Sequence, residues 1–299
     1  MSVRILQFGT TGQLARELLA RAKDFDVEIT ALSRAEADFS DADAVVRRLR
    51  AARTDLVVLA AAYTAVDLAE SERDLAFQVN AATPAAVARA LGVDGPALVQ
   101  VSTDYVFDGR KGSPYVETDA PAPLNVYGAS KLEGERQILA ACPRALILRT
   151  SWVVSAHGKN FVKTMLRLAG EGKPLKVVDD QFGRPTAARD LALFILSQAR
   201  RLADAPAGDP VFGIHHFANA GEVSWKGFAE GVFEFACGAN APTVGASATS
   251  DWPAPAARPL RGTLDTSRLE RTFGVTPRPW REAVAEIVAE LQAEQRSAA

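Results

Sequence analysis

Short apolar runs alternate with longer amphipathic segments along the first half of this 299-residue chain. A strand covered on both faces is apolar at nearly every position, so these runs predict strands of a parallel sheet. The predicted strands are residues 3–8, 27–32, 56–62, 97–102 and 145–150. Apolar residues at helical spacing predict helices at residues 13–23, 42–52, 69–78, 84–91 and 129–141. This alternation predicts an α/β fold with a doubly wound parallel sheet.

The alternation loosens in the second half of the chain. Further helices are expected at residues 160–169, 187–201 and 280–295, and strands at 175–178 and 213–218. Residues 238–259 are rich in Ala, Pro, Ser and Thr and predict an extended loop. We expect a dinucleotide-binding Rossmann domain at residues 1–152, to which residues 187–218 return. A smaller C-terminal substrate lobe, residues 153–186 and 219–299, would close over the carboxyl edge of the sheet, where ligands of such sheets bind.

Composition narrows the classes of function. The net charge is −2, with no basic stripe, so the electrostatic footprint of nucleic-acid binding is missing. No apolar segment approaches the roughly 18 residues of a membrane span, and the first residues lack signal-peptide features, so we expect a cytoplasmic protein. Cys142 and Cys237 lie far apart in sequence and are expected in the core. The adjacent His215 and His216 would face opposite sides of a strand, which does not suit a metal site.

A glycine-rich turn follows the first predicted strand and opens the first predicted helix. It reads Gly9-Thr10-Thr11-Gly12-Gln13-Leu14-Ala15. Glycines at such a turn let the backbone approach a pyrophosphate, which the helix N-terminus stabilises. The spacing G-x-x-G-x-x-A departs from G-x-G-x-x-G, and the alternative is an ordinary strand-to-helix turn. Its place at the first strand of an alternating α/β pattern favours cofactor binding.

The end of the second strand bears on the choice of cofactor. An acidic residue there favours NAD, whereas an arginine accommodates the 2′-phosphate of NADP. This strand ends in Leu32-Ser33-Arg34, which predicts NADPH, with NADH as the alternative if Arg34 is only a solvated loop residue. Asp38 and Phe39 follow closely and are expected near the adenosine.

A phenol and an ammonium are four residues apart at a predicted helix start, in Tyr127-Gly128-Ala129-Ser130-Lys131. A tyrosine with a pKa near 10 is a poor acid–base group at neutral pH, and a nearby cation favours its ionised form. Thr103 follows a central strand, where a donor to a reacting carbonyl oxygen belongs. Each feature alone has a structural alternative, an exposed helix pair or a capped strand end. Together with the glycine-rich turn they predict a nicotinamide-dependent reductase.

The chain resembles the dTDP-4-dehydrorhamnose reductases, a family of extended short-chain dehydrogenases. Nearly the whole chain contributes, through GTTGQLA, AAYTAVDLAE, STDYVFDG, PLNVYGASK, RTSWV, NFVKTMLRLA and DQFGRPT. The resemblance implies NAD(P)H-dependent reduction of the C4 carbonyl of dTDP-4-dehydro-L-rhamnose to dTDP-L-rhamnose, a step in building cell-surface polysaccharides.

The resemblance also implies roles for individual residues. Tyr127 would donate the proton to the carbonyl oxygen, assisted by Thr103 and Lys131. The implied cofactor residues are Gly9, Gly12, Gln13, Leu14, Asp38, Phe39, Ala62, Tyr63 and Thr64, together with Tyr127 and Lys131. The implied substrate residues are Thr103, Asp104, Trp152, Asn160, Phe161, Arg184, Pro185 and Arg258.

The chain departs from the family at a metal site. Some members dimerise through magnesium held by glutamates, one of them just after the segment corresponding to DQFGRPT. Arg189 and Asp190 occupy that position here, although Glu17, Glu290 and Glu294 are acidic. We therefore expect no bound metal, while the resemblance still allows for a homodimer.

Two rival functions use the same fold. The first is a related sugar-nucleotide epimerase or dehydratase; a dehydratase needs a further acid–base pair, and no glutamate directly follows Asp104. The second is a non-catalytic NADP-binding subunit. A relative of the family serves in this way, as a regulatory subunit of methionine adenosyltransferase. A binding subunit would not need Thr103, Tyr127 and Lys131, which are all present.

Overall fold

The sheet is parallel throughout and has six strands. A computed structural model describes residues 2–171 and 175–298. The strands are β1 (Val3–Phe8), β2 (Val27–Leu32), β3 (Leu56–Leu59), β4 (Ala97–Thr103), β5 (Ala145–Thr150) and β10 (Gly213–His216). Their order is β10-β5-β4-β3-β1-β2. Because β2 and β3 flank β1, the winding reverses between β1 and β3, and a ligand crevice is expected at the carboxyl ends of these two strands.

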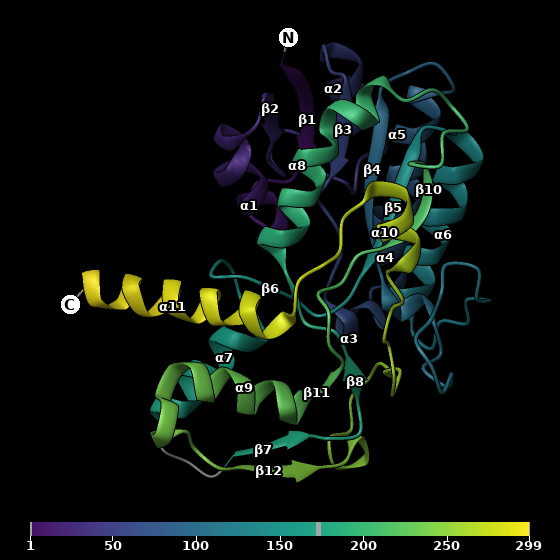
Figure 1. The fold of residues 1–299 in the computed structure, drawn as a ribbon. Helices are drawn as coiled ribbons and strands as arrows, with labels where there is room; N and C mark the ends of the chain where they lie inside the picture. Colours follow the sequence, from purple (N-terminus) through teal and green to yellow (C-terminus); the bar gives the residue numbers. More distant parts are fainter. Residues whose placement is uncertain (1, 172–174, 299) are drawn as a thin grey trace.

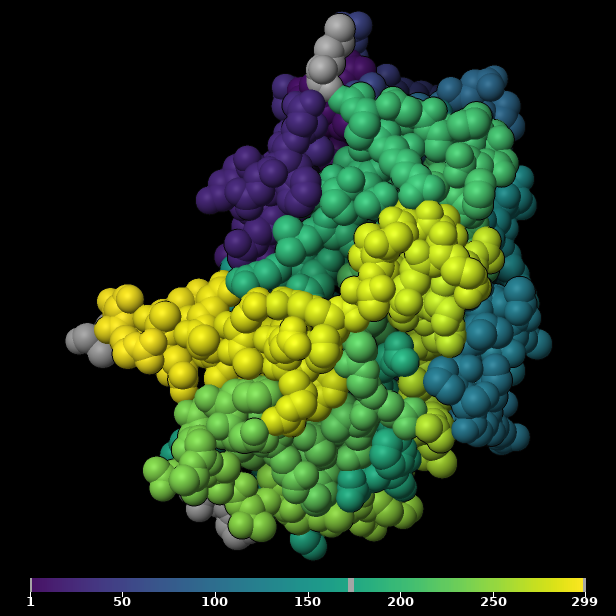
Figure 2. All heavy atoms as spheres, viewed as in Figure 1, coloured from purple at the N-terminus to yellow at the C-terminus, as the bar shows by residue number. Residues whose placement is uncertain are grey.

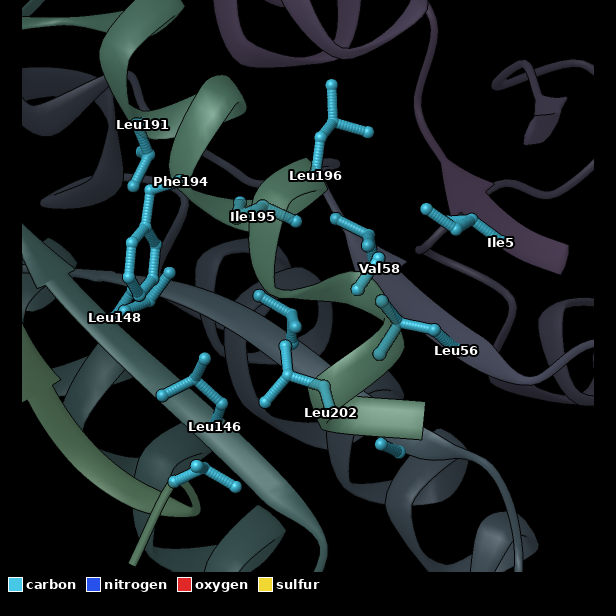
Figure 3. Close-up of a cluster of buried hydrophobic side chains, with 14 of the residues drawn as sticks. Ile5, Leu56, Val58, Leu146, Leu148, Leu191, Phe194, Ile195, Leu196 and Leu202 are labelled. Carbon is cyan, nitrogen blue, oxygen red and sulfur yellow. The ribbon is translucent and has the colours of Figure 1, made fainter. Parts of the chain in front are cut away.

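Helices cover both faces of the sheet (Figure 1). On one face lie α1 (Gln13–Arg21), α8 (Ala188–Asp204) and α10 (Ser267–Phe273), and on the other α2 (Ala42–Ala51), α5 (Thr83–Leu91) and α6 (Val126–Ala141). Leu56 and Val58 join the first apolar cluster, with the α8 side chains drawn in Figure 3. Val57 and Leu59 join the second. Burial of both faces is why β3 lacks polar alternation, whereas the edge strand β2 exposes alternate residues.

A smaller group of elements packs below the sheet (Figure 1). The strand β7 (Leu175–Val178) pairs in parallel with β12 (Val244–Ser247). The helices α7 (Phe161–Gly170), α9 (Trp225–Cys237) and α11 (Trp280–Ala298) build an apolar cluster with them. Figure 2 shows α11 lying across the boundary between the two parts, with its C-terminal end projecting beyond them.

Short elements complete the connections. Two-residue strands pair as β6 (Val153–Val154) with β9 (Thr186–Ala187) and as β8 (Phe182–Gly183) with β11 (Val223–Ser224). The chain between β3 and α5 forms α3 (Val66–Ala69), α4 (Arg73–Phe77) and a π-helical turn at Gln78–Ala82. Tight 3₁₀ turns lie at Ala22–Asp24, Asp104–Val106, Gly238–Asn240 and Thr249–Asp251. Within the described ranges, no helix is long and apolar enough to cross a membrane.

Several predicted boundaries were wrong. The third strand ends at Leu59 and not at residue 62, which leaves Ala60 onward as a loop over the carboxyl edge. The helix α6 begins at Val126, three residues before the predicted start, because the Asn125 Oδ1 accepts a hydrogen bond from the Gly128 amide at 2.8 Å. The predicted loop at residues 238–259 contains β12, which pairs with β7 and packs Val244 into the apolar cluster of the smaller lobe.

The helix α10 had no prediction and lies inside the segment assigned to the substrate lobe. Its Leu269 and Phe273 nevertheless pack in the cluster on the α8 face of the sheet. The helix α8 and strand β10, from residues 187–218, also belong to the sheet layers. The proposed division into two lobes stays a prediction. The packing of α10 groups this helix with the sheet layers.

Candidate active site

A cavity of about 600 Å³ opens at the carboxyl edge of the sheet, beside the point where the winding reverses. Many of the residues predicted from sequence line it. They are Gly12, Gln13, Leu14, Ala62, Thr64, Thr103, Asp104, Tyr127, Lys131 and Trp152. Parallel strands end at a common edge, which is why segments after β1, β3, β4 and β5 meet here, joined by the start of α6.

The glycine-rich turn lies against the loop after β3. Gly9 has a φ of 101°, and a Cβ at this position would lie 3.1 Å from the Ala61 backbone nitrogen. Only glycine combines this backbone conformation with so close an approach. Gly12 precedes α1 and offers no side-chain cap, so the first amides of the helix are left to a ligand. Such a helix N-terminus suits an anion.

Tyr127, Thr103 and Lys131 come together in this cavity. Tyr127 lies in the first turn of α6, where the Asn125 cap positions it, and Thr103 ends β4. The Thr103 and Tyr127 side chains both line this cavity, and Thr103 lowers the pKa of the Tyr127 phenol. One turn further along α6, the Lys131 Nζ donates to the Val101 carbonyl at 2.7 Å. The predicted catalytic group is thus assembled around one space.

Burial sets the proton affinities of the two groups. It raises the pKa of Tyr127 to about 12, although Thr103 opposes the rise. It lowers the pKa of Lys131 to about 8, opposed by the negative charge of Glu135. Contrary to the expectation from the sequence, Lys131 does not lower the pKa of Tyr127. Tyr127 therefore holds its proton at neutral pH, as a proton donor must.

Asp104 is a buried carboxyl beside this group, with 2% of its surface exposed. Its Oδ1 accepts from the Thr103 hydroxyl at 3.1 Å, and its Oδ2 has no hydrogen-bond partner in the described part of the chain. Burial raises the pKa of Asp104 to about 7. Gly262 makes room for it, since a Cβ there would lie 2.2 Å from the Asp104 Oδ2.

A stacked tryptophan pair forms one wall of the cavity. The rings of Trp152 and Trp225 are 3.6 Å apart at an angle of 12°. Trp152 has a φ of 46°, which no other described residue except glycine shares in sign. Gly183 packs against its indole, where a Cβ would lie 2.6 Å from the Cε2 atom. The wall presents flat apolar area to a ligand.

The comparisons with known proteins agree with this geometry. The family model described as RmlD substrate binding domain matches residues 3–293. A dTDP-4-dehydrorhamnose reductase of Sinorhizobium fredii is 43% identical over 99% of this chain and 100% of its own length. The Escherichia coli K12 reductase of that name is 40% identical over 97% of this chain and 98% of its own.

A solved structure covers the chain as fully. The crystal structure of the Bacillus anthracis dTDP-4-dehydrorhamnose reductase, in complex with NADP, has a TM-score of 0.89 and 34% identity, and covers 97% of this chain and 100% of its own. The chain belongs to the dTDP-4-dehydrorhamnose reductase family. The predicted resemblance, the doubly wound α/β fold of an extended short-chain dehydrogenase and the assignment as an oxidoreductase are confirmed.

Asn80 is a buried residue beside this site that the sequence did not single out. Its Oδ1 accepts from the Tyr63 amide at 3.0 Å, and its Nδ2 donates to the Tyr63 carbonyl and the Ser130 Oγ, each at 3.0 Å. It thereby ties the loop after β3 to α6, next to Lys131. Its only sequence signal is a polar residue in an apolar helical stretch. The π-helical turn that aims it inward depends on tertiary packing.

Four predicted cofactor residues, Arg34, Asp38, Phe39 and Tyr63, do not line the cavity with their side chains. The Arg34 side chain is 80% exposed and pairs with Asp38 at 3.0 Å. The Phe39 ring packs against Phe8 in the sheet core, with ring centroids 5.6 Å apart, and its carbonyl accepts from the Thr83 hydroxyl at 2.7 Å. The Tyr63 hydroxyl donates to Glu72 at 2.7 Å, on the surface.

The predicted nucleotide residues are spread more widely. Phe161 and Arg258 line a second, apolar cavity of about 700 Å³, which shares Trp225 with the first. Arg258 is held there by Asp67 at 3.0 and 2.8 Å. Asn160 caps α7, while Arg184 and Pro185 line neither cavity.

The position of Arg189 does not fit the magnesium site of some family members. Its guanidinium donates to Glu290 and Glu286 on α11. The described residues contain no group of three His, Cys, Asp or Glu side chains arranged to hold a metal. Glu286 and Glu290 are thus already paired with a fixed cation.

Proposed function

We propose that this chain reduces the C4 carbonyl of dTDP-4-dehydro-L-rhamnose with NADPH and forms dTDP-L-rhamnose. The observation that carries the proposal is the group formed by Thr103, Tyr127 and Lys131 in the cavity beside the glycine-rich turn. Family membership selects the sugar nucleotide. NADH is the alternative cofactor.

The cofactor would lie across the point where the winding reverses. Its pyrophosphate would bind the backbone at Gly9, Gly12, Gln13 and Leu14, at the N-terminus of α1. Ala62, Tyr63 and Thr64 would follow its nicotinamide half, and Arg34, Asp38 and the Phe39 backbone its adenosine half. Bound there, the reduced nicotinamide supplies the hydride for the sugar C4 atom.

Tyr127 would give its phenolic proton to the O4 atom of the sugar as hydride reaches C4. The raised pKa of Tyr127 keeps that proton in place until the oxygen becomes basic. Thr103 would donate a hydrogen bond to the same oxygen, and Lys131 would hold the nicotinamide ribose. The carbonyl gains one hydride and one proton, which balances the reduction to an alcohol.

The substrate would extend from this point into the smaller lobe. Asp104 and Trp152 would contact the sugar, and Phe161 and Arg258, in the adjoining cavity, would contact the nucleotide. Arg184 supports this wall through its carbonyl, which accepts from Ser151 at 2.7 Å. Asn160, Arg184 and Pro185 would serve the substrate indirectly, by supporting the walls of its site.

A coupled assay tests the function. dTDP-4-dehydro-L-rhamnose is generated in place, the protein is added with NADPH or NADH, and absorbance of the reduced nicotinamide is followed. We expect oxidation that depends on the sugar nucleotide, with dTDP-L-rhamnose as product. Folded protein that oxidises neither cofactor would favour the binding-subunit alternative. NAD that copurifies tightly with the protein would favour an epimerase.

A further inference from the structure

Residues 153–160 run from β6 to the cap of α7 and face the glycine-rich turn. We call this segment the strap. Val153, Gly158 and Lys159 of the strap line the same cavity as Thr11 and Gly12 of the turn. The cofactor cavity therefore has one wall from the first strand–helix unit and one wall from a segment more than 140 residues later.

Gln13 joins the two walls through both ends of its amide. Its Nε2 donates to the Val153 carbonyl at 3.1 Å. Its Oε1 accepts from the Ser155 Oγ and the Asn160 Nδ2, each at 3.0 Å. An amide that donates at one end and accepts at the other has a single satisfied orientation. The family resemblance placed Gln13 at the pyrophosphate, but its side chain points to the strap.

Further contacts hold the strap in one conformation. The Asn160 Nδ2 also donates to the Ser155 carbonyl at 2.7 Å, and the Lys163 Nζ donates to the Ala156 carbonyl at 3.0 Å. His157 lies 3.8 Å from Glu17 on α1. Gly158 has a φ of 66°, which turns the chain just before Lys159. The strap is thus attached to α1 and to α7.

This arrangement places the positive charge of Lys159 beside the glycine-rich turn. Lys131 is the other lysine that lines the cavity, and its Nζ is hydrogen-bonded to Val101 deep beside Tyr127. Lys159 is exposed, and no described residue forms an ion pair or hydrogen bond with its side chain. The N-terminus of α1 offers only about half a positive charge. A dinucleotide pyrophosphate carries two negative charges.

We propose that the strap covers the pyrophosphate of the bound dinucleotide, that the Lys159 ammonium binds it, and that Gln13 is the positioning residue that holds the strap there. This rests on the proposed function, because it assumes a nicotinamide dinucleotide in the cavity. The smaller lobe then completes the cofactor site as well as holding the sugar nucleotide.

The first test measures cofactor affinity of the full chain by fluorescence titration with NADPH and with NADH. The variants are Lys159→Met, Lys159→Arg and, as a charge-matched control on the surface, Lys23→Met. We expect Lys159→Met to weaken both cofactors by a similar factor of about ten, because both carry the pyrophosphate. The affinity of Lys159→Arg should stay within about threefold of wild type. The loss of affinity in Lys159→Met should be smaller at high salt.

The second test asks whether Gln13 acts through the strap. Lys159→Met is measured in the wild-type and in the Gln13→Ala background, which keeps the backbone amide of residue 13. We expect Lys159→Met to weaken cofactor binding by a clearly smaller factor when the Gln13 side chain is absent. The same factor in both backgrounds would overturn the positioning role of Gln13.

Other outcomes separate the strap from the proposed function. If Lys159→Met binds both cofactors as tightly as the Lys23→Met control does, the strap proposal is overturned and the proposed function is not. Weakening confined to NADPH would assign Lys159 to the 2′-phosphate and likewise overturn the pyrophosphate contact. Folded wild-type protein that binds neither cofactor would instead overturn the proposed function.

Discussion

Arg149 and Glu135 form an ion pair with both side chains at most 2% exposed. The Arg149 Nε and Nη2 donate to the carboxylate at 3.0 and 2.6 Å. Glu135 lies one helical turn from Lys131 and raises its pKa, against the effect of burial. The pair therefore places a compensated negative charge next to the proposed catalytic lysine.

Removal of Arg149 alone should be costly. Arg149→Met leaves the Glu135 carboxylate buried without its partner, and we expect a loss of about 3–5 kcal/mol in the free energy of unfolding. The double variant Arg149→Met, Glu135→Leu removes both charges and should recover most of it. Denaturant unfolding of the three proteins measures this. A single variant as stable as wild type would show that the pair contributes nothing.

Tyr127→Phe should abolish most turnover while leaving cofactor binding nearly unchanged. Loss of a positioned proton donor costs roughly 10²–10⁴ in rate. Stopped-flow or steady-state rates with saturating substrate measure the loss, and cofactor titration measures binding. Tyr105→Phe is a matched control, because its ring packs edge-on against Tyr127 at 5.8 Å. Unchanged turnover in Tyr127→Phe would contradict the proposed acid role.

Turnover should fall as pH rises through about 8. The buried Lys131 has its pKa lowered to about 8, so it loses its proton above that pH, whereas Tyr127, with a pKa of about 12, stays protonated. A pH–rate profile from 6 to 10 should show this alkaline limb. Lys131→Met should be slow at every pH and lack the limb. Asp104→Asn should leave the limb in place, because Asp104 titrates near 7. A limb that persists without Lys131 would have another origin.

Arg34→Ala should weaken NADPH more than NADH. The Arg34 guanidinium is largely exposed beside Asp38, where it can turn to a 2′-phosphate. We expect about tenfold weaker NADPH binding and less than twofold for NADH, as for loss of one charged hydrogen bond. Equal weakening of both cofactors would show that Arg34 does not read the phosphate.

Chelation of divalent cations should leave the protein's mass in solution and thermal stability unchanged. Arg189 already bridges α8 to Glu286 and Glu290 of α11. Light scattering and thermal unfolding with EDTA or with magnesium measure both properties, and the mass also tests the predicted homodimer. Arg189→Met should lower the melting temperature by about 2 °C or more, in contrast to Arg200→Met near the exposed end of α8. A magnesium-dependent mass would contradict this.

Much of the fold was predictable because its signals are local. The largely apolar runs at β1, β3 and β5 reflect burial on both faces. The glycine-rich turn is a short motif, and so is Tyr127 with Lys131. Errors occurred where long-range contacts decide the structure. The strand β12 has little strand character of its own and is ordered by β7, and α10 depends on its contact with the sheet.

The sequence by itself determined the α/β layering, the family and the identity of the proposed catalytic residues, because periodicity and short motifs encode them within a few residues. Only the tertiary structure decided which side chains share a space. Gln13 turns to the strap, Phe39 to the core, and Trp152 stacks on Trp225. It also decided the proton affinities of Tyr127 and Lys131, because desolvation depends on every segment that surrounds a group.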